Sequence, residues 1–288
     1  MSYPEDLRAL VEAELERLRF PAPAQTVGLE EAMRYSLLAG GKRIRPVLAL
    51  STARAVGAEP ARFLAVATAL ELIHTYSLIH DDLPAMDDDA LRRGLPTAHV
   101  KYGEDVAILA GDGLFAEAVR LFCEQPGEPA RVLAALRELT AATGVDGMVG
   151  GQYVDVAGEA GDAAALRALH GLKTGRLIAA SVGVVLTLEG MAEPETIPYS
   201  RFAGELGVLF QIVDDILDVT GTDAALGKPS GSDERMGKRT YVSHFGVSGA
   251  RDLARECHES ASASLREAAP AGATELEQIT DFILTRTA

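Results

Sequence analysis

Apolar residues recur along this chain with the spacing of amphipathic helices. The first stripe begins just after Pro4 and places leucine or valine at positions 7, 10, 11, 15 and 18, with acidic residues on the opposite face. Alanine is abundant, and the apolar–polar alternation that is typical of strands is rare. Comparable stripes predict further helices over residues 29–38, 43–56, 60–82, 104–124, 129–144, 162–188, 195–219, 247–268 and 273–286.

The predicted helices are joined without an internal repeat, a low-complexity tract or a flexible linker, so we expect residues 1–288 to form a single domain. Two of the helices, 60–82 and 195–219, are apolar on most sides and therefore belong at the centre of a bundle. Each ends its apolar run in aspartates, which places both acidic clusters at the rim of a central cavity. The predicted fold class is all-α, a single large bundle of about ten helices around that cavity.

Composition narrows the classes of function. The chain has 288 residues, of which 48% are hydrophobic, which is ample for a core and argues against disorder. A net charge of −15 argues against nucleic acid as a partner, because phosphate binding needs a basic face.

Features linked to location point to the cytoplasm. The N-terminus lacks the basic-then-apolar form of a signal peptide, and the longest apolar stretch, 177–188, is too short to span a bilayer. Cys123 and Cys257 lie far apart without metal-ligand spacing, as expected of buried free thiols in a reducing compartment. We therefore expect a soluble cytoplasmic protein with no stable membrane insertion.

Five aspartates fall within the ten residues 80–89, directly before Arg92-Arg93-Gly94. Carboxylates this close raise each other's pKa unless a cation lies among them. Pro84 ends the helix after Asp82, so the chain can turn back and bring Asp87 toward Asp81. Oxygen ligands of this kind suit a hard cation such as Mg²⁺, which also binds phosphate. A solvated helix end is the alternative, and the spacing of a helical calcium loop is absent.

A second cluster, Asp214, Asp215 and Asp218, lies inside an apolar helix. Asp214 and Asp218 share one helix face, with Gln211 one turn earlier. Burying three carboxylates without partners would be costly, and few bases lie within four residues to form structural ion pairs. Metal binding therefore explains this cluster better than a structural role.

Basic residues are more dispersed. Two glycines precede Lys42 and Arg45 at the start of a helix, which is a plausible phosphate cradle although not a Walker loop. His74 lies about two turns before Asp81 and can donate to a phosphate, whereas His80 more plausibly orients or packs than binds metal. Further candidates in glycine-containing segments are Lys173, Thr174, Lys228 and Lys238.

Taken together, these motifs resemble those of the trans-isoprenyl diphosphate synthases, or polyprenyl synthetases, and most of all the bacterial-type short-chain enzymes. The resemblance covers nearly the whole chain. It rests on Asp-Asp-x4-Asp with Arg-Arg-Gly at 81–94, Asp-Asp-x-x-Asp at 214–218, Gly-Gly-Lys-Arg-x-Arg-Pro at 40–46, His-x5-His-Asp-Asp at 74–82, Gly-Gln-x-x-Asp at 151–155, Lys-Thr at 173–174 and Gly-Lys…Gly-Lys-Arg-Thr-Tyr at 227–241.

The resemblance implies a role for each motif residue. Three Mg²⁺ ions, with Mn²⁺ as a substitute, would be bound by Asp81, Asp82, Asp87, Asp214, Asp215 and Asp218. The allylic diphosphate would be bound by Arg92, Lys173, Thr174, Gln211, Lys228 and Lys238, and catalysis would rest on Arg92, Lys173, Thr174 and Gln211. Isopentenyl diphosphate would bind without metal to Lys42, Arg45, His74 and Arg93. The family's spacing favours Asp87 over Asp88 as a ligand, and Asp155 is expected to organise the metal site indirectly.

The implied reaction joins isopentenyl diphosphate to dimethylallyl or geranyl diphosphate and yields farnesyl diphosphate. Metal ions and positively charged Arg and Lys side chains neutralise the departing diphosphate. The isopentenyl double bond then attacks the allylic cation, and the released diphosphate takes the proton. Tyr76 lies five residues before Asp81, about 7.5 Å along a helix axis. In the family that the chain resembles, the positions four and five before this aspartate form the cavity floor, so the resemblance implies that Ser77 and Tyr76 form it here and that the Tyr76 ring stops the product at fifteen carbons.

Alternatives remain open. Tyr76 can instead be an ordinary core residue, and geranylgeranyl diphosphate is the second candidate product. A class I terpene cyclase would carry a different second metal motif, and a non-catalytic synthase subunit would have lost one acidic motif. The family also implies a homodimer.

Overall fold

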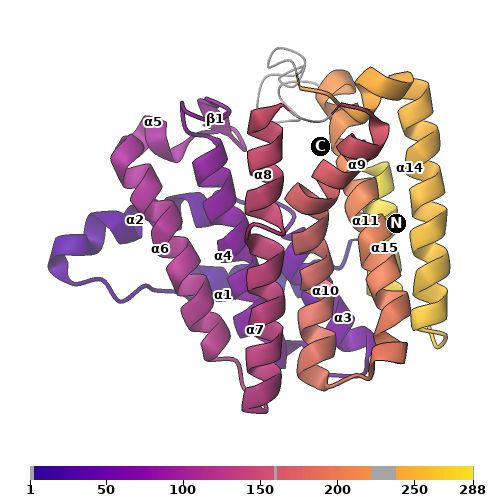
Figure 1. Ribbon diagram of the computed structural model, residues 1–288. Helices are drawn as coiled ribbons and strands as arrows, with labels where there is room; N and C mark the ends of the chain where they lie inside the picture. The colour runs from indigo at the N-terminus through magenta and orange to yellow at the C-terminus, as the bar shows by residue number, and fades with distance from the viewer. Residues whose placement is uncertain (1–2, 159–160, 222–237, 288) are drawn as a thin grey trace.

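The computed structural model describes residues 3–158, 161–221 and 238–287, and these form an almost entirely helical bundle (Figure 1). The exception within this part of the chain is a short antiparallel hairpin, in which β1 (Leu91–Arg92) pairs with β2 (Leu95–Pro96). The predicted all-α fold class is confirmed.

Helices occupy most of the predicted positions. Their bounds are α1 Glu5–Arg17, α2 Val27–Leu37, α3 Ile44–Ala55, α4 Leu64–Asp81, α5 Ala98–Tyr102, α6 Glu104–Cys123, α7 Pro129–Thr143, α8 Met148–Ala157, α9 Ala163–His170, α10 Arg176–Glu189, α11 Glu193–Thr220, α14 Tyr241–Ala268 and α15 Thr274–Thr285. Short 3₁₀ turns at Ala24–Thr26 and Pro60–Phe63 precede α2 and α4, and a π-helical turn at Gly171–Gly175 joins α9 to α10.

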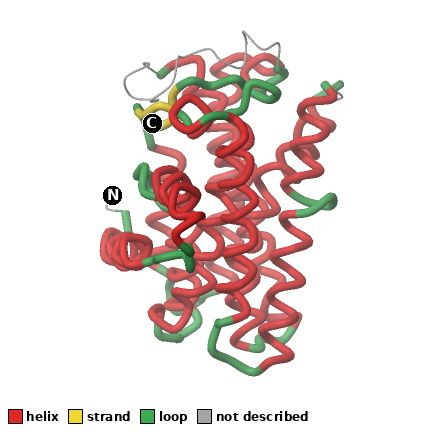
Figure 2. The backbone as a smooth tube through the Cα atoms, turned by 90° about the vertical axis from the view of Figure 1, so that its left-hand side faces the viewer, coloured by secondary structure: helices red, strands yellow, loops and turns green. Residues whose placement is uncertain are grey.

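The two helices that end in aspartates lie in the core, as predicted. Helix α4 is buried along nearly all of its length and packs against α3 and α6, while α11 packs against α10 and α14. Figure 2 shows the helices running largely along one direction, with the strands near one end of the bundle. The acidic end of α4 and the hairpin that follows it therefore lie at the same end.

Two stretches, Pro60–Asp81 and Ala163–Glu189, are long and apolar enough to cross a membrane by length and composition. Most of each stretch is buried inside the protein. Burial of this kind is expected of the central helices of a bundle.

Helices α5 and α8 were missed by the sequence pattern, because glycines and short length weaken the helical signal. Helix α8 contains Gly150 and Gly151, and Gly151 is required by packing, since a Cβ atom there would lie 2.3 Å from the backbone nitrogen of Lys173. The predicted helix 162–188 is interrupted by the π-helical turn. Helix α14 begins at Tyr241 rather than 247, and its backbone leaves helical geometry at Gly246, where φ is 66°.

The two cysteines differ in environment. Cys257 is buried, as expected, whereas Cys123 is exposed at the end of α6. The prediction that both thiols are buried is therefore wrong for Cys123.

Candidate active site

A cavity of about 680 Å³ lies where the end of α4, the hairpin, α8, the π-helical turn and α11 meet. Charged side chains line its two sides. Carboxylates come from α4 and α11, while cationic groups come from α3, the hairpin, the π-helical turn and the C-terminal residues. The predicted site residues that line it are Arg45, His74, Tyr76, Ser77, Asp81, Arg92, Arg93, Lys173, Thr174, Gln211 and Asp214.

The first acidic cluster turns back on itself as predicted. The backbone N–H of Asp87 donates to the Asp81 carbonyl at 2.9 Å, and that of Asp88 donates to the Leu83 carbonyl at 3.1 Å. Asp87 is half-buried and its Oδ1 accepts from Lys238 Nζ at 2.9 Å, whereas Asp88 is exposed. This arrangement favours Asp87 over Asp88 as the inward carboxylate.

Asp81 and Asp82 face different partners. Burial is the main effect that raises the pKa of Asp81 to about 6. The negative charges of Asp87 and Asp82 raise it further, and the positive charges of Lys173 and Arg92 oppose the shift. Asp82 is 3% exposed and does not line the cavity, and its Oδ1 accepts from Arg92 Nε at 2.9 Å. In this arrangement Asp82 orients Arg92, and its predicted role as a metal ligand stays a prediction.

The three aspartates of the second cluster also differ in whether they line the cavity. Asp214 lines the cavity and forms an ion pair with Arg286. Asp215 is 2% exposed, and its oxygens accept from Gln211 Nε2 at 2.9 Å and from the Tyr241 backbone N–H at 2.7 Å. Asp218 is buried and lies outside the cavity lining. Asp215 anchors Gln211 and the start of α14, and its predicted role as a metal ligand stays a prediction.

The π-helical turn presents two predicted catalytic side chains to the cavity. Such turns add a residue to a helix and often occur at functional sites. Lys173 Nζ donates to Asp155 Oδ2 at 2.5 Å, and Thr174 Oγ1 donates to Gln211 Oε1 at 3.1 Å. Asp155 also lies 3.8 Å from Lys238 Nζ, so it holds both lysines near the cavity. This contact agrees with its expected indirect role.

Arg45, His74 and Arg93 form a basic wall of the cavity. Burial lowers the pKa of Arg45 to about 10, against the opposing charges of Glu71 and Asp214, and its Nε is buried without a partner among the described residues. Burial, followed by the charges of Arg45, Arg93 and Arg43, lowers the pKa of His74 well below its ordinary value, so the ring is neutral at pH 7. A neutral ring can still donate one hydrogen bond to a phosphate oxygen.

Three predicted anion ligands are not among the residues that line the cavity, and one of them, Lys238, pairs with Asp87. Lys42 does not line it, and its Nζ lies 5.3 Å from the centre of the Phe282 ring. Lys228 falls outside the described residues.

Sequence reasoning missed two polar cavity residues. Gln152 lines the cavity, and both of its amide atoms are buried without a partner among the described residues. The Gly-Gln-x-x-Asp motif was the available signal for Gln152. Arg286 also lines the cavity and donates to the Phe210 carbonyl at 3.2 Å.

The residues fit a cation that is shared with a phosphate. Among the described residues, no three His, Cys, Asp or Glu side chains converge closely enough to hold a metal ion alone. The cavity carboxylates come from separate helices, Asp81 from α4 and Asp214 from α11. Mg²⁺ uses one or two carboxylates together with substrate phosphates and water, so this sparse oxygen set suits it.

Comparisons with known proteins agree with this geometry. Residues 27–274 match the family model for polyprenyl synthetase. The chain is 45% identical to the farnesyl diphosphate synthase of Geobacillus stearothermophilus, with 94% of this chain and 91% of that protein covered. It is 41% identical to the farnesyl diphosphate synthase of Escherichia coli (strain K12), with 99% of each covered. The chloroplastic geranylgeranyl pyrophosphate synthase of Capsicum annuum is 43% identical, with 90% and 71% covered.

Among solved structures, the chain resembles the geranyltransferase of Helicobacter pylori complexed with magnesium and isoprenyl diphosphate. The TM-score is 0.88 at 31% identity, and the match covers 99% of this chain and 97% of that one. An FPP/GFPP synthase from Zymomonas mobilis gives a TM-score of 0.86, also at 31% identity, with 98% and 97% covered.

Proposed function

The chain belongs to the polyprenyl synthetase family, and we propose that it condenses isopentenyl diphosphate with dimethylallyl and geranyl diphosphates to give farnesyl diphosphate. The observation that carries this proposal is a single cavity with carboxylates and a basic wall, large enough for two small ligands. Geranylgeranyl diphosphate is the second candidate product, because synthases of that product are also similar to this chain.

Asp81, Asp87 and Asp214 would hold Mg²⁺, and we propose three ions with Mn²⁺ as a substitute. The ions would supply positive charge to the diphosphate, whose leaving oxygen becomes more negative as its bond to carbon breaks. Lys173, Lys238 and Arg92 add further positive charge from the protein on the same side.

Thr174 and Gln211 both line the cavity, and they would support the allylic cation. The hydroxyl and the amide are already joined at 3.1 Å, and Asp215 fixes the amide from behind. Their oxygen dipoles can stabilise a carbocation without attacking it covalently. The isopentenyl double bond then forms the new carbon–carbon bond, and the released diphosphate takes the proton that restores the double bond.

Tyr76 supports a fifteen-carbon product. Its ring lines the cavity, is 8% exposed, and meets Phe115 of α6 edge-on with ring centres 5.5 Å apart. The Tyr76 ring also meets His80 with ring centres 5.7 Å apart, so two aromatic neighbours contact it. Tyr76→Ala is expected to shift products beyond fifteen carbons, and an unchanged product distribution would exclude this tyrosine as the floor.

The function is tested by incubating the protein with labelled isopentenyl diphosphate, Mg²⁺ and either dimethylallyl or geranyl diphosphate. Labelled farnesyl diphosphate is expected from both primers. A released hydrocarbon would instead indicate a cyclase, and no condensation would indicate a non-catalytic subunit.

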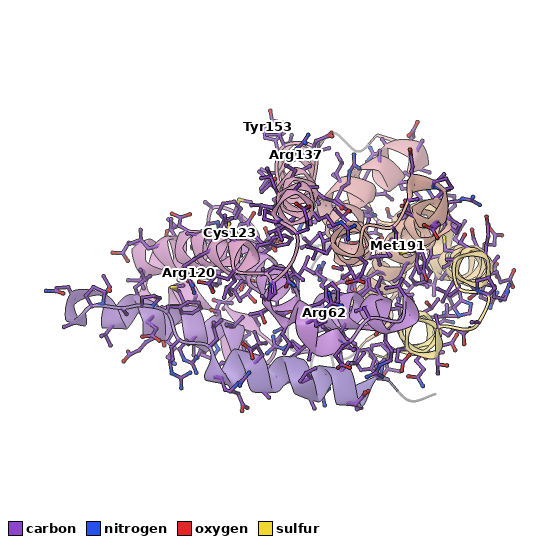
Figure 3. The ribbon with its side chains drawn as sticks, turned by 90° about the horizontal axis from the view of Figure 1, so that it is seen from below. Arg62, Arg120, Cys123, Arg137, Tyr153 and Met191 are labelled. Carbon is purple, nitrogen blue, oxygen red and sulfur yellow. The ribbon has the colours of Figure 1, made fainter. Side chains whose placement is uncertain are left out.

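We also propose a cytoplasmic homodimer. Apolar side chains are exposed on neighbouring helices α6, α7 and α8, including Leu109, Leu133, Tyr153 and Val156, which are between 54% and 72% exposed. Figure 3 shows Tyr153 at the outer edge of the molecule. Burying such a face is favourable, and homodimers are the commonest soluble oligomers. Sedimentation as a monomer would contradict the dimer, and recovery in the membrane fraction of cells would contradict the location.

A further inference from the structure

The loop that leads into α3 is held by a residue that does not face the cavity. Arg43 lies between Lys42 and Arg45, and its guanidinium is fully buried. It donates from Nη1 to Glu71 Oε1 at 2.6 Å, from Nη2 to the Leu37 carbonyl at 2.9 Å and from Nε to Glu12 Oε1 at 2.9 Å. Its backbone φ of 55° is left-handed, which a residue with a side chain adopts when its surroundings hold it there.

Glu71 is the carboxylate at the centre of this arrangement. It lies on α4 and is 1% exposed, so its charge needs nearby compensation. Arg43 supplies the direct contact. The charge of Glu71 also raises the pKa of Arg45 and of Arg93, in both cases against the larger lowering effect of burial. One buried carboxylate therefore supports three arginines, two of which line the cavity.

The loop is tied at further points. Arg93 donates to the Gly40 carbonyl, and its guanidinium leaves no room for a side chain at Gly41, where φ is 123°. Tyr3 donates to the Lys42 carbonyl at 2.8 Å. The Glu71–Arg43 pair is the most deeply buried of these ties.

We propose that Glu71 is a positioning residue for isopentenyl diphosphate, holding Arg43 so that the loop directs Arg45 into the cavity beside Arg93. Its buried charge keeps these two arginines together before the diphosphate arrives. This inference rests on the proposed function, and it adds a residue that does not itself touch the substrate.

The effect of Glu71 should be confined to one substrate. Arg92, on the allylic side, forms ion pairs with Asp82 and Asp89 rather than with Glu71. The two arginine groups thus depend on separate carboxylates. A change at Glu71 should reach isopentenyl diphosphate and leave the allylic substrate unaffected.

Glu71→Gln is the sharpest test, because it removes the charge and retains an oxygen that can accept from Arg43. We expect the KM for isopentenyl diphosphate to rise roughly tenfold or more, since one partner of a buried ion pair is lost. The KM for the allylic diphosphate should stay within about twofold. Calorimetric binding of isopentenyl diphosphate in EDTA should weaken by a factor similar to its KM.

Glu138→Gln is the matched control. Glu138 on α7 is another largely buried carboxylate, but it accepts from Thr187 at 3.0 Å and does not line the cavity. Both KM values should stay unchanged in that variant, whatever its thermal stability. Should Glu71→Gln not fold, Glu12→Gln serves in its place, because Glu12 is 27% exposed and also contacts Arg43. A rise of about threefold in the KM for isopentenyl diphosphate alone would support the inference.

Wild-type affinity for isopentenyl diphosphate in the tested variant, or an equal rise in both KM values, overturns the positioning role and leaves the function intact. A wild-type protein that neither binds isopentenyl diphosphate nor condenses it overturns the proposed function itself.

Discussion

The basic wall and the acidic wall of the cavity obtain their stability in different ways. Arg45 and Arg93 are supported by Glu71, which is buried outside the cavity. On the acidic wall, Asp214 is paired with Arg286, and Arg286 itself lines the cavity. The partner that stabilises the basic wall therefore lies outside the cavity, whereas the partner of Asp214 lies within it.

This difference has a consequence for binding. An anion can reach Arg45 without displacing a partner, because the Nε of Arg45 has none among the described residues. A cation approaching Asp214 or Asp87 must compete with Arg286 or Lys238. We infer that the basic wall is preorganised. On the acidic wall, Arg286 and Lys238 must release Asp214 and Asp87 before metal ions bind these carboxylates.

Chelation of divalent cations should give the largest difference between the functions of the two walls. EDTA is expected to reduce condensation by roughly 10⁴-fold or more, because the departing diphosphate loses its main source of neutralising charge. Isopentenyl diphosphate binding, measured calorimetrically, should stay within about twofold. Loss of that binding in EDTA would show that the basic wall is not preorganised.

Asp81→Asn should lower kcat by roughly 10³-fold, because it removes a carboxylate that faces the cavity. Asp88→Asn is the matched control, since Asp88 belongs to the same run but is exposed. It should retain nearly wild-type kcat in the labelled-isopentenyl assay. A large loss in Asp88→Asn would reverse our choice of Asp87 over Asp88.

Arg45→Gln should lower kcat/KM for isopentenyl diphosphate by roughly 100-fold, through the loss of a charged contact to phosphate. The KM for the allylic substrate should change little. Arg54→Gln on the same helix is the control, because Arg54 binds Asp6 and Glu275 on the surface. Equal losses for both substrates in Arg45→Gln would mean that the two diphosphates share one wall.

The sequence was sufficient for the bundle and for the central helices. Helices α4 and α11 are apolar on most sides until they reach Asp81 and Asp214. Periodicity and charge therefore both predicted central helices with carboxylates at the cavity. The turn that brings Asp87 to Asp81 also followed from Pro84.

Long-range partners were beyond a local pattern. Arg286 and Asp214 are 72 positions apart, and Glu71 and Arg43 are 28 apart. In the sequence, Glu71 is a single charge within an apolar helix, and nothing local identifies its partner. The direction of the Lys42 side chain was also beyond its motif: the side chain extends toward Phe282, and its predicted contact with isopentenyl diphosphate stays a prediction.

The smallest effect should come from His170, which stands just before the π-helical turn that carries Lys173. Burial, against the charge of Asp155, lowers the pKa of His170 to about 4. The unfolded chain therefore takes up a proton near pH 6.5 that the folded protein refuses, so stability falls as pH drops from about 6.5 to 4. Between pH 7 and pH 5 this histidine should cost about 2 kcal/mol of unfolding free energy.

His170→Gln should remove that contribution, so urea unfolding of the variant should lose less stability than the wild type over the same interval. The ring is 7% exposed and its Nδ1 lacks a partner among the described residues, so nothing nearby rewards protonation except Asp155. An identical pH dependence in both proteins would mean that water reaches His170 freely.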